Sequence, residues 1–272
     1  MQFEKPPLVE LVAEVKWLSV PSGSPPQNIQ PVNPTSTQPM FATSDQEEFF
    51  AAFTRESARS GWTASERMFP SGLPLLSYQP ALRVRSLQEK ETQMIYQVGP
   101  GLFSAHALPP YKNWESFRPF VERGLAYLIQ SRPKGERGME FFSVSLRYLD
   151  VFTPELVGDV QLGAFLTDIL GFSLQLPGVL TAQLRQGTEA EPTLGLLLPL
   201  QSGLEMRLNI GRGIMGDKSG IIVDTGVSTS RGIGPTSGEV FAVWEEAHTA
   251  IRRTFVGLTG KLHAAMIPIE ET

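Results

Sequence analysis

The chain of 272 residues contains no cysteine and only three histidines. The lack of cysteine excludes disulfide bonds, thiolate metal sites and cysteine nucleophiles, and it fits a reducing compartment. No stretch approaches the roughly 18 consecutive apolar residues that a membrane-spanning helix needs. The first ten residues also lack the basic and then apolar pattern of a secretory signal. We therefore expect a soluble cytoplasmic protein with no membrane association.

An excess of positive charge is also lacking. The chain has 23 Lys and Arg against 28 Asp and Glu, which gives a formal net charge of −5. Proteins that coat nucleic acid usually show a basic balance, so we expect no broad nucleic-acid binding. The apolar share of 41% is typical of a globular chain, which at this length forms one large domain or two small ones.

What is present is organised around a long helix, predicted from Thr236 to Gly260. Thr236 and Glu239 have the spacing of a capping box, and glycine suits the left-handed end of a helix. One face of this helix is apolar at steps of three and four residues, which is the period of an α-helix: Val240, Trp244, Ala247, Ile251, Phe255, Leu258 and Leu262.

Periodicity and turn residues predict further elements along the chain. The expected helices are 44–60, 111–130, which contains Pro119, and 160–170. The expected strands are 8–18, 73–79, 81–87, 92–98, 102–108, 140–152, 179–186, 193–200, 204–210 and 220–227. Residues 19–39 are rich in proline and serine and are expected to form a flexible loop. Consecutive hairpin strands favour an α+β fold with a mostly antiparallel sheet and helices packed on one face.

Residues 1–132 and residues 139–272 are each predicted to contain, in this order, a strand, a helix, several strands and a long helix. In both long helices apolar or small residues follow a tryptophan in the same register, from Trp114 and from Trp244. This likeness favours an internal duplication within one compact unit. Two unrelated amphipathic helices also share part of such a register by chance, so the alternative stays open.

Two short motifs resemble known catalytic or cofactor signatures. Asp224-Thr225-Gly226 is similar to the triplet of aspartic proteases, in which two carboxylates share a proton, but we favour a strand that ends in a turn. Residues 211–216 match GxGxxG. A strand is predicted to follow them, where a dinucleotide site needs a helix, so hairpin glycines explain this motif better. None of the histidines has a metal-ligand spacing, and we predict no metal and no cofactor.

Arginine recurs on the polar face of several predicted strands. The candidate ligand-binding residues are Arg83, Arg85, Arg147, Arg185 and Arg207. Guanidinium groups bind carboxylate and phosphate through paired N–H groups. A sheet face left free by the helices would therefore bind a protein partner or a small anionic ligand. A solvated face with Arg–Glu pairs across strands, or the interface of a homodimer, explains the same pattern.

Four stretches together resemble a family of sporadically distributed bacterial proteins of this length and of unknown function. They are Pro7-Leu8-Val9-Glu10, Trp114-Glu115-Ser116-Phe117, Leu146-Arg147-Tyr148-Leu149-Asp150, and the helix with Trp244, His248, Ile251 and Phe255. The resemblance covers nearly the whole chain. It implies a bacterial protein that forms one full-length unit, and it carries over no catalytic residue.

These observations lead to a non-enzymatic binding or partner-interaction protein. It would use the arginine-bearing sheet face or a cavity between the sheet and the long helices. A first alternative is a hydrolase or transferase that uses scattered carboxylates, with Asp150 and Asp224 as candidates. A second is a chaperone-like or defence-associated module. Of these functions, the sequence favours one that is not enzymatic.

Overall fold

The computed structural model describes residues 2–19, 39–41, 44–70, 73–87, 93–110 and 113–269. Nearly all of the predicted loop 19–39 lies outside the described residues. The described chain forms an α+β fold, and every strand pair with a defined register is antiparallel. This confirms the predicted fold class.

The larger sheet of the described residues has nine strands, hydrogen-bonded in the order β10-β11-β12-β9-β2-β8-β7-β6-β4. Its strands are β2 (Leu8–Trp17), β4 (Ala64–Arg67), β6 (Leu82–Arg85), β7 (Gln93–Gly99), β8 (Leu102–Leu108), β9 (Phe141–Phe152), β10 (Leu194–Pro199), β11 (Leu204–Met215) and β12 (Lys218–Thr229). Two small sheets pair β1 (Gln2–Phe3) with β13 (Pro268–Ile269) and β3 (Pro39–Phe41) with β5 (Pro74–Leu76).

The helices differ greatly in length. They are α1 (Ser44–Ala58), α2 (Trp114–Ser131), α3 (Pro154–Val157), α4 (Leu162–Ala164) with a π-helical turn at Phe165–Ile169, α5 (Gly178–Thr181), α6 (Ser237–Leu258), a 3-10 turn at Gly260–Leu262, and α7 (His263–Met266). The predicted helix 236–260 is thus confirmed as α6. Thr236 caps it, because the Glu239 amide donates to the Thr236 hydroxyl at 3.3 Å.

The chain folds into two compact units that are not continuous in sequence. Unit 1 contains residues 1–10, 147–227 and 248–272, and unit 2 contains residues 11–146 and 228–247. Strands β2, β9 and β12 and helix α6 contribute residues to both units. The division between the units therefore differs from the predicted one between residues 132 and 139. The described residues do not show an internal duplication.

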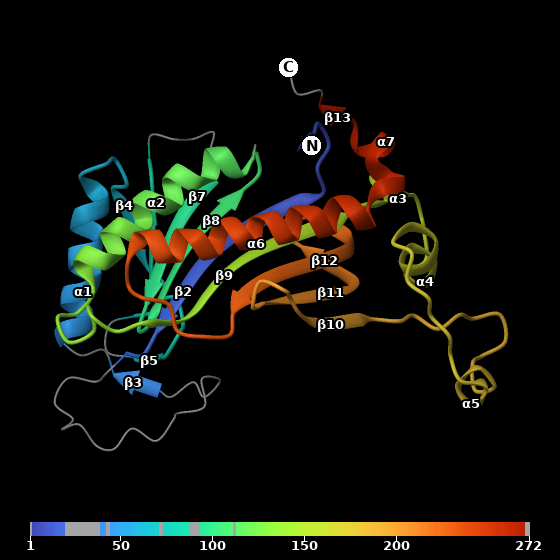
Figure 1. The fold of residues 1–272 in the computed structure, drawn as a ribbon, viewed down its shortest axis with the longest axis horizontal. Coiled ribbons are helices and arrows are strands. Elements are labelled where there is room, and N and C mark those ends of the chain that lie inside the picture. The colour runs from blue at the N-terminus through green and yellow to red at the C-terminus, as the bar shows by residue number, and fades with distance from the viewer. Residues whose placement is uncertain are drawn as a thin grey trace. The chain divides into compact units, whose positions relative to one another are not determined.

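The core of unit 2 is rich in aromatic side chains. The predicted alternation of β2 is confirmed, since Leu11, Ala13, Val15 and Trp17 are all buried. Helices α1 and α2 lie beside β7 and β8 (Figure 1). Phe53 of α1 contacts one aromatic ring from each of β7, β8 and α2. Tyr96 of β7 stacks on Phe120 of α2 with ring centroids 3.9 Å apart. Such packing explains why a short amphipathic helix is stable here.

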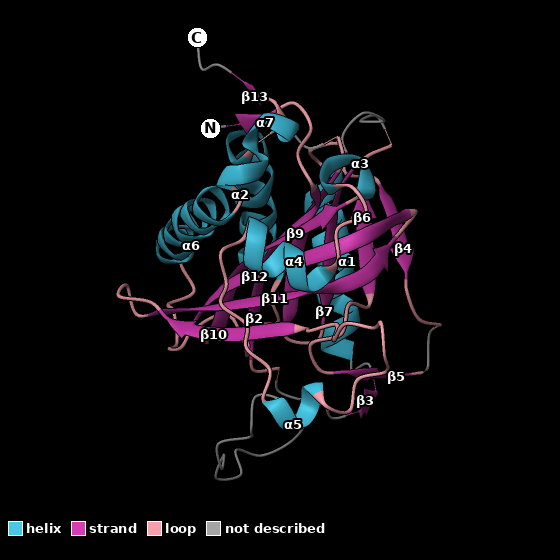
Figure 2. Cartoon of the chain, turned by 90° about the vertical axis from the view of Figure 1, so that its right-hand side faces the viewer, coloured by secondary structure: helices cyan, strands magenta, loops and turns pink. Residues whose placement is uncertain are grey.

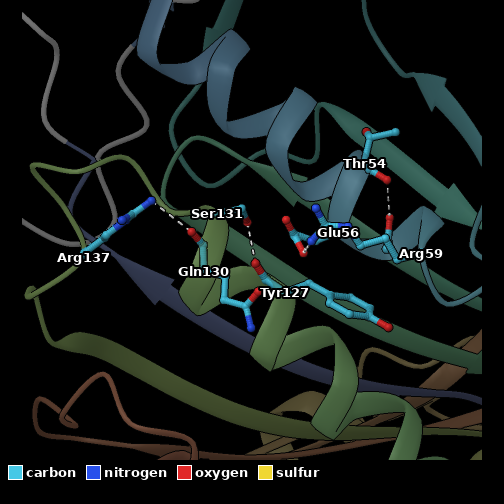
Figure 3. A network of polar contacts seen from close by, with 8 residues as sticks. Thr54, Glu56, Arg59, Tyr127, Gln130, Ser131 and Arg137 are labelled. Carbon is cyan, nitrogen blue, oxygen red and sulfur yellow. Dashed lines mark hydrogen bonds and ion pairs between the residues drawn. The ribbon is translucent and has the colours of Figure 1, made fainter.

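Polar contacts lie at the C-terminal ends of α1 and α2, as Figure 3 shows. The Ser131 hydroxyl donates to the Tyr127 carbonyl at 2.6 Å, and Arg137 donates to the Gln130 carbonyl at 3.0 Å. The last turn of α2 contains no basic residue. Arg137, from the connector that follows, supplies the positive charge that the carbonyl end of a helix favours.

Unit 1 has its own apolar core between its strands and short helices. Phe152 of β9, Leu208 and Ile210 of β11, and Ile221 and Val223 of β12 form one buried cluster. Leu162, Phe165 and Leu166 join this cluster from α4 and its π-helical turn, which lie beside β11 and β12 in Figure 2. Phe255 and Leu258 of α6 pack against it. Helices α4 and α6 and the π-helical turn thus pack on one face of these strands.

Two predicted elements differ from the structure. The predicted strand 179–186 is wrong: this stretch contains α5 and turns, and all of it is exposed. Without neighbouring strands its alternating pattern has nothing to pack against, so hydrogen bonds between near neighbours prevail. The predicted helix 111–130 begins at Trp114, where the Asn113 side chain accepts a hydrogen bond from the Ser116 amide at 2.8 Å. Strand β4 had no sequence signal.

Candidate functional site

The candidate arginines do not lie in one place. Arg83 and Arg85 belong to β6 of unit 2, whereas Arg147 and Arg207 belong to β9 and β11 in unit 1. Arg185 is not in the sheet, because it lies in the exposed turn after α5. Each unit therefore presents its own polar strand surface, and the predicted role of Arg185 on a sheet face is wrong.

In unit 2 the arginines face a carboxylate on the next strand. The register places Glu66 of β4 opposite Arg83, and its carboxylate lies 3.7 Å from Arg83 and 4.0 Å from Arg85. These distances are long for ion pairs, and all three side chains are partly exposed. The arrangement matches the predicted alternative of Arg–Glu pairs across strands, which contribute little when solvated.

The same unit places a serine beside a histidine on β8. The Ser104 hydroxyl lies 2.9 Å from Nε2 of His106, and Glu14 of β2 is opposite Ser104 in the register. A serine, a histidine and a carboxylate are the groups of a hydrolytic triad. Ser104 is only 2% exposed, however, so its hydroxyl is closed to a substrate. The spacing of two residues on a strand is the sequence signal by which this pair could have been found.

In unit 1 the central feature is an ion pair between β9 and β12. The Nε and Nη2 atoms of Arg147 donate to the two carboxylate oxygens of Asp224 at 2.6 and 2.8 Å. Asp224-Thr225-Gly226 lies inside β12, with Thr225 buried, and not at a strand end as predicted. Both oxygens of Asp224 thus accept hydrogen bonds from a cationic side chain, whereas in a protease dyad a carboxylate oxygen lies against a second carboxylate.

A shallow depression of about 370 Å³ lies beside this ion pair on β10, β11 and β12. Asp224, Asn209, Ile222, Gly195 and Gly211 are among the residues that line it. Gly195 pairs with Asn209 of the neighbouring strand, and a Cβ atom on Gly195 would lie 3.4 Å from the Asn209 side-chain oxygen. We call Arg147, Asn209, Asp224 and this depression the Asp224 surface. It offers hydrogen-bond donors and acceptors side by side.

The other candidate carboxylate, Asp150, belongs to a different environment. It is 4% exposed, and burial raises the pKa of its carboxyl to about 7. Its side chain lies on the same face of β9 as those of Tyr148 and Phe152. Tyr148 contacts His248 of α6, and Phe152 contacts Phe255 of α6. Arg147, three residues away, points to the opposite face. Asp150 and Asp224 therefore do not assemble into a pair of catalytic carboxylates.

Within the described ranges, no three His, Asp or Glu side chains are grouped as a metal site requires. Over the same residues, no helix combines the length and apolarity needed to cross a membrane. Comparison of the chain with protein-family models, with curated proteins and with solved structures finds no match. The resemblance to a bacterial family of unknown function stays a prediction.

Proposed function

We propose that this protein is a non-enzymatic binding protein that recognises a protein partner through the Asp224 surface of unit 1. The observation that supports this proposal is the fixed position of Asp224: its carboxylate is held by both donors of Arg147 at the rim of a depression that Asn209 also lines. A carboxylate held in this way is an oriented hydrogen-bond acceptor.

The chemistry of the surface indicates what the partner presents. Asn209 offers both an amide donor and a carbonyl acceptor, and Asp224 offers an acceptor. Gly195 and Gly211 line the depression without side chains, which allows close approach by another main chain. An extended peptide segment, whose N–H and C=O groups alternate, meets these requirements. A small anion would instead have to displace Asp224 from Arg147.

A second candidate function comes from Asp150. A carboxyl with a pKa of about 7 has the value that suits a general acid or base. This carboxyl is almost fully buried, and it does not line the depression of the Asp224 surface. We therefore rank a hydrolase or transferase behind the binding function. Turnover that disappears in Asp150→Asn would reverse this ranking.

Affinity purification of the full chain with identification of bound proteins by mass spectrometry tests the binding function. The test variant combines Asn209→Ala with Asp224→Ala, and Asp159→Ala is the matched control, because Asp159 is an exposed aspartate that lies outside the sheet. We expect a stoichiometric partner that the double variant loses and the control keeps. Equal recovery of the partner by all three proteins would contradict a role for the Asp224 surface.

A further inference from the structure

An exposed segment of unit 1 carries apolar side chains that its own chain does not cover. Every residue from 173 to 189 is exposed, and we call this stretch the arm. Its large apolar side chains and their exposed fractions are Leu174 (42%), Leu176 (43%), Val179 (69%), Leu180 (49%) and Leu184 (39%). Single exposed apolar residues are ordinary, but five within so short a stretch indicate a contact surface.

The backbone hydrogen bonds of α5 and its turns join near neighbours in the sequence. The amides of Leu180 and Thr181 donate to the Pro177 carbonyl, and that of Leu184 donates to the Thr181 carbonyl. In Figure 1 the arm, with α5, extends away from α4 and from β10 of the same unit. Ordering a backbone costs about 1–2 kcal/mol for each residue. Burial of apolar surface normally offsets this cost, whereas the five large apolar side chains of the arm stay exposed.

Strand β10, which follows the arm, is an edge strand of the described sheet. It is hydrogen-bonded to β11 on one side and is the last strand in the order. Leu197 is 55% exposed and Leu198 is 39% exposed. The strand, Leu-Gly-Leu-Leu-Leu-Pro, contains no charged residue. Natural sheets protect such edges with charges, bulges or covering segments, since a bare apolar edge pairs with other chains.

We infer that the arm and β10 form a twofold interface with a second copy of this chain. An uncharged edge strand is complementary to itself, since two copies related by a twofold axis pair antiparallel. The stretch from 173 to 199 also matches the roughly 20–30 residues that each partner contributes to a stable interface. The arm carries both signs of charge, in Arg185 and Glu189, so two copies present opposite charges to each other.

The oligomeric mass of the full chain in solution tests this inference. Light scattering after size-exclusion chromatography should give about twice the chain mass of 29.9 kDa. Leu197→Lys places a charge on the edge, and Val179→Asp with Leu180→Asp places charges on the arm. Each change should weaken association at least tenfold. These side chains are exposed, so circular dichroism should show an unchanged fold.

Ile214→Lys is the matched control, because Ile214 is 76% exposed but lies at the far end of β11 and outside the arm. It should leave the mass of the dimer unchanged. Since the chain has no cysteine, a single Leu197→Cys should also give a disulfide-linked dimer on mild oxidation, and Ile214→Cys should not. A wild-type protein that is monomeric at all concentrations overturns the inference, and so does a dimer that survives the edge and arm variants.

This inference does not depend on the proposed function. The partner-capture experiment probes Asn209 and Asp224, whereas the mass measurement probes Leu197 and the arm. If the protein dimerises and captures no partner, the result would support the interface and contradict the proposed binding function. If the protein is a monomer and captures a partner through the Asp224 surface, the result would support the binding function and contradict the interface.

Discussion

Arg147 and Asp224 are joined by two hydrogen bonds of 2.6 and 2.8 Å between neighbouring strands β9 and β12. The arginine side chain is about half exposed and that of the aspartate is 21% exposed. The pair therefore holds a carboxylate in a fixed orientation while leaving it accessible. The pair therefore positions the Asp224 carboxylate, and we expect it to contribute little to the free energy of unfolding.

A double-mutant cycle with Arg147→Ala and Asp224→Ala should measure a weak coupling. We expect about 0.2–1 kcal/mol, because exposed ion pairs gain little Coulomb energy in water. The coupling should fall as salt is raised, since mobile ions screen solvated charges. Urea denaturation of the four proteins provides the numbers. The exposed Arg212–Glu191 pair, at 2.9 Å, serves as the control cycle, and a coupling above about 2 kcal/mol would show that the pair is structural.

Stability should depend on pH through Asp150. The folded pKa of about 7 lies above the value of about 3.9 expected in the unfolded chain, so the unfolded state loses this proton first. The stabilisation is complete below about pH 4, declines as pH rises towards 7, and is absent above that. The difference is on the order of 4 kcal/mol. Urea denaturation from pH 4 to 8 measures it.

Asp150→Asn tests the same group, because its amide resembles the protonated acid in shape and charge. The variant should be more stable than the wild type at pH 8 and should lose most of the slope between pH 5 and 7. Asp159→Asn, at an exposed position, should keep the wild-type slope. An unchanged slope in Asp150→Asn would show that other groups dominate the titration.

Glu136 should be essential to the stability of unit 2. It is 4% exposed and accepts a hydrogen bond of 2.5 Å from the Trp17 indole. It also faces Arg132, a guanidinium that lies over the Trp17 ring and whose pKa is lowered to about 10 by burial. Glu136→Ala removes the acceptor of the Trp17 indole and the negative charge that interacts with Arg132, and should cost about 3 kcal/mol.

Glu136→Gln should cost less than the alanine variant, because its amide oxygen still accepts from the indole. Glu155→Ala, at an exposed position in α3, should have no effect beyond about 0.5 kcal/mol. Tryptophan fluorescence during denaturation follows the change directly. Equal stability of the alanine and glutamine variants would argue against the hydrogen bond as the cause.

Two helical glycines should respond to alanine in opposite ways. A Cβ atom on Gly124 of α2 would lie 2.3 Å from the Tyr96 ring and 2.8 Å from the Phe103 ring, so Gly124→Ala must displace the core. We expect a loss of about 1–3 kcal/mol. Gly257 of α6 has open space around it. Gly257→Ala should stabilise by up to about 1 kcal/mol, because alanine has the higher helix propensity. Thermal unfolding distinguishes the two.

Strong local patterns predicted the elements well. The alternation of β2 and β9 and the apolar stripe of α6 identified these elements, because each buries one regular face in a core. The stretch 179–186 failed for the complementary reason. Its alternation of apolar and polar residues is real, but no strand lies beside it, so the chain turns at Pro177 and forms α5.

The candidate site was only partly predictable. The sequence identified Arg147 and Asp224 as candidates but assigned them to different functions, and it did not single out Asn209 as a candidate. Glu66, which faces Arg83 and Arg85, had no signal because β4 is short and its alternation weak. Cross-strand partners depend on which strands are neighbours and on their register. Neither is encoded within a single strand.

The local sequence determined the element types, the buried faces and the absence of cysteine chemistry, since these follow from residue spacing and composition. Strand order, by contrast, depends on contacts between distant segments. It places Arg147 against Asp224, groups residues 1–10 with the C-terminal helix residues in unit 1, and leaves β10 at the edge of the described sheet with apolar side chains exposed. Long-range packing chose among pairings that local preferences leave equally favourable.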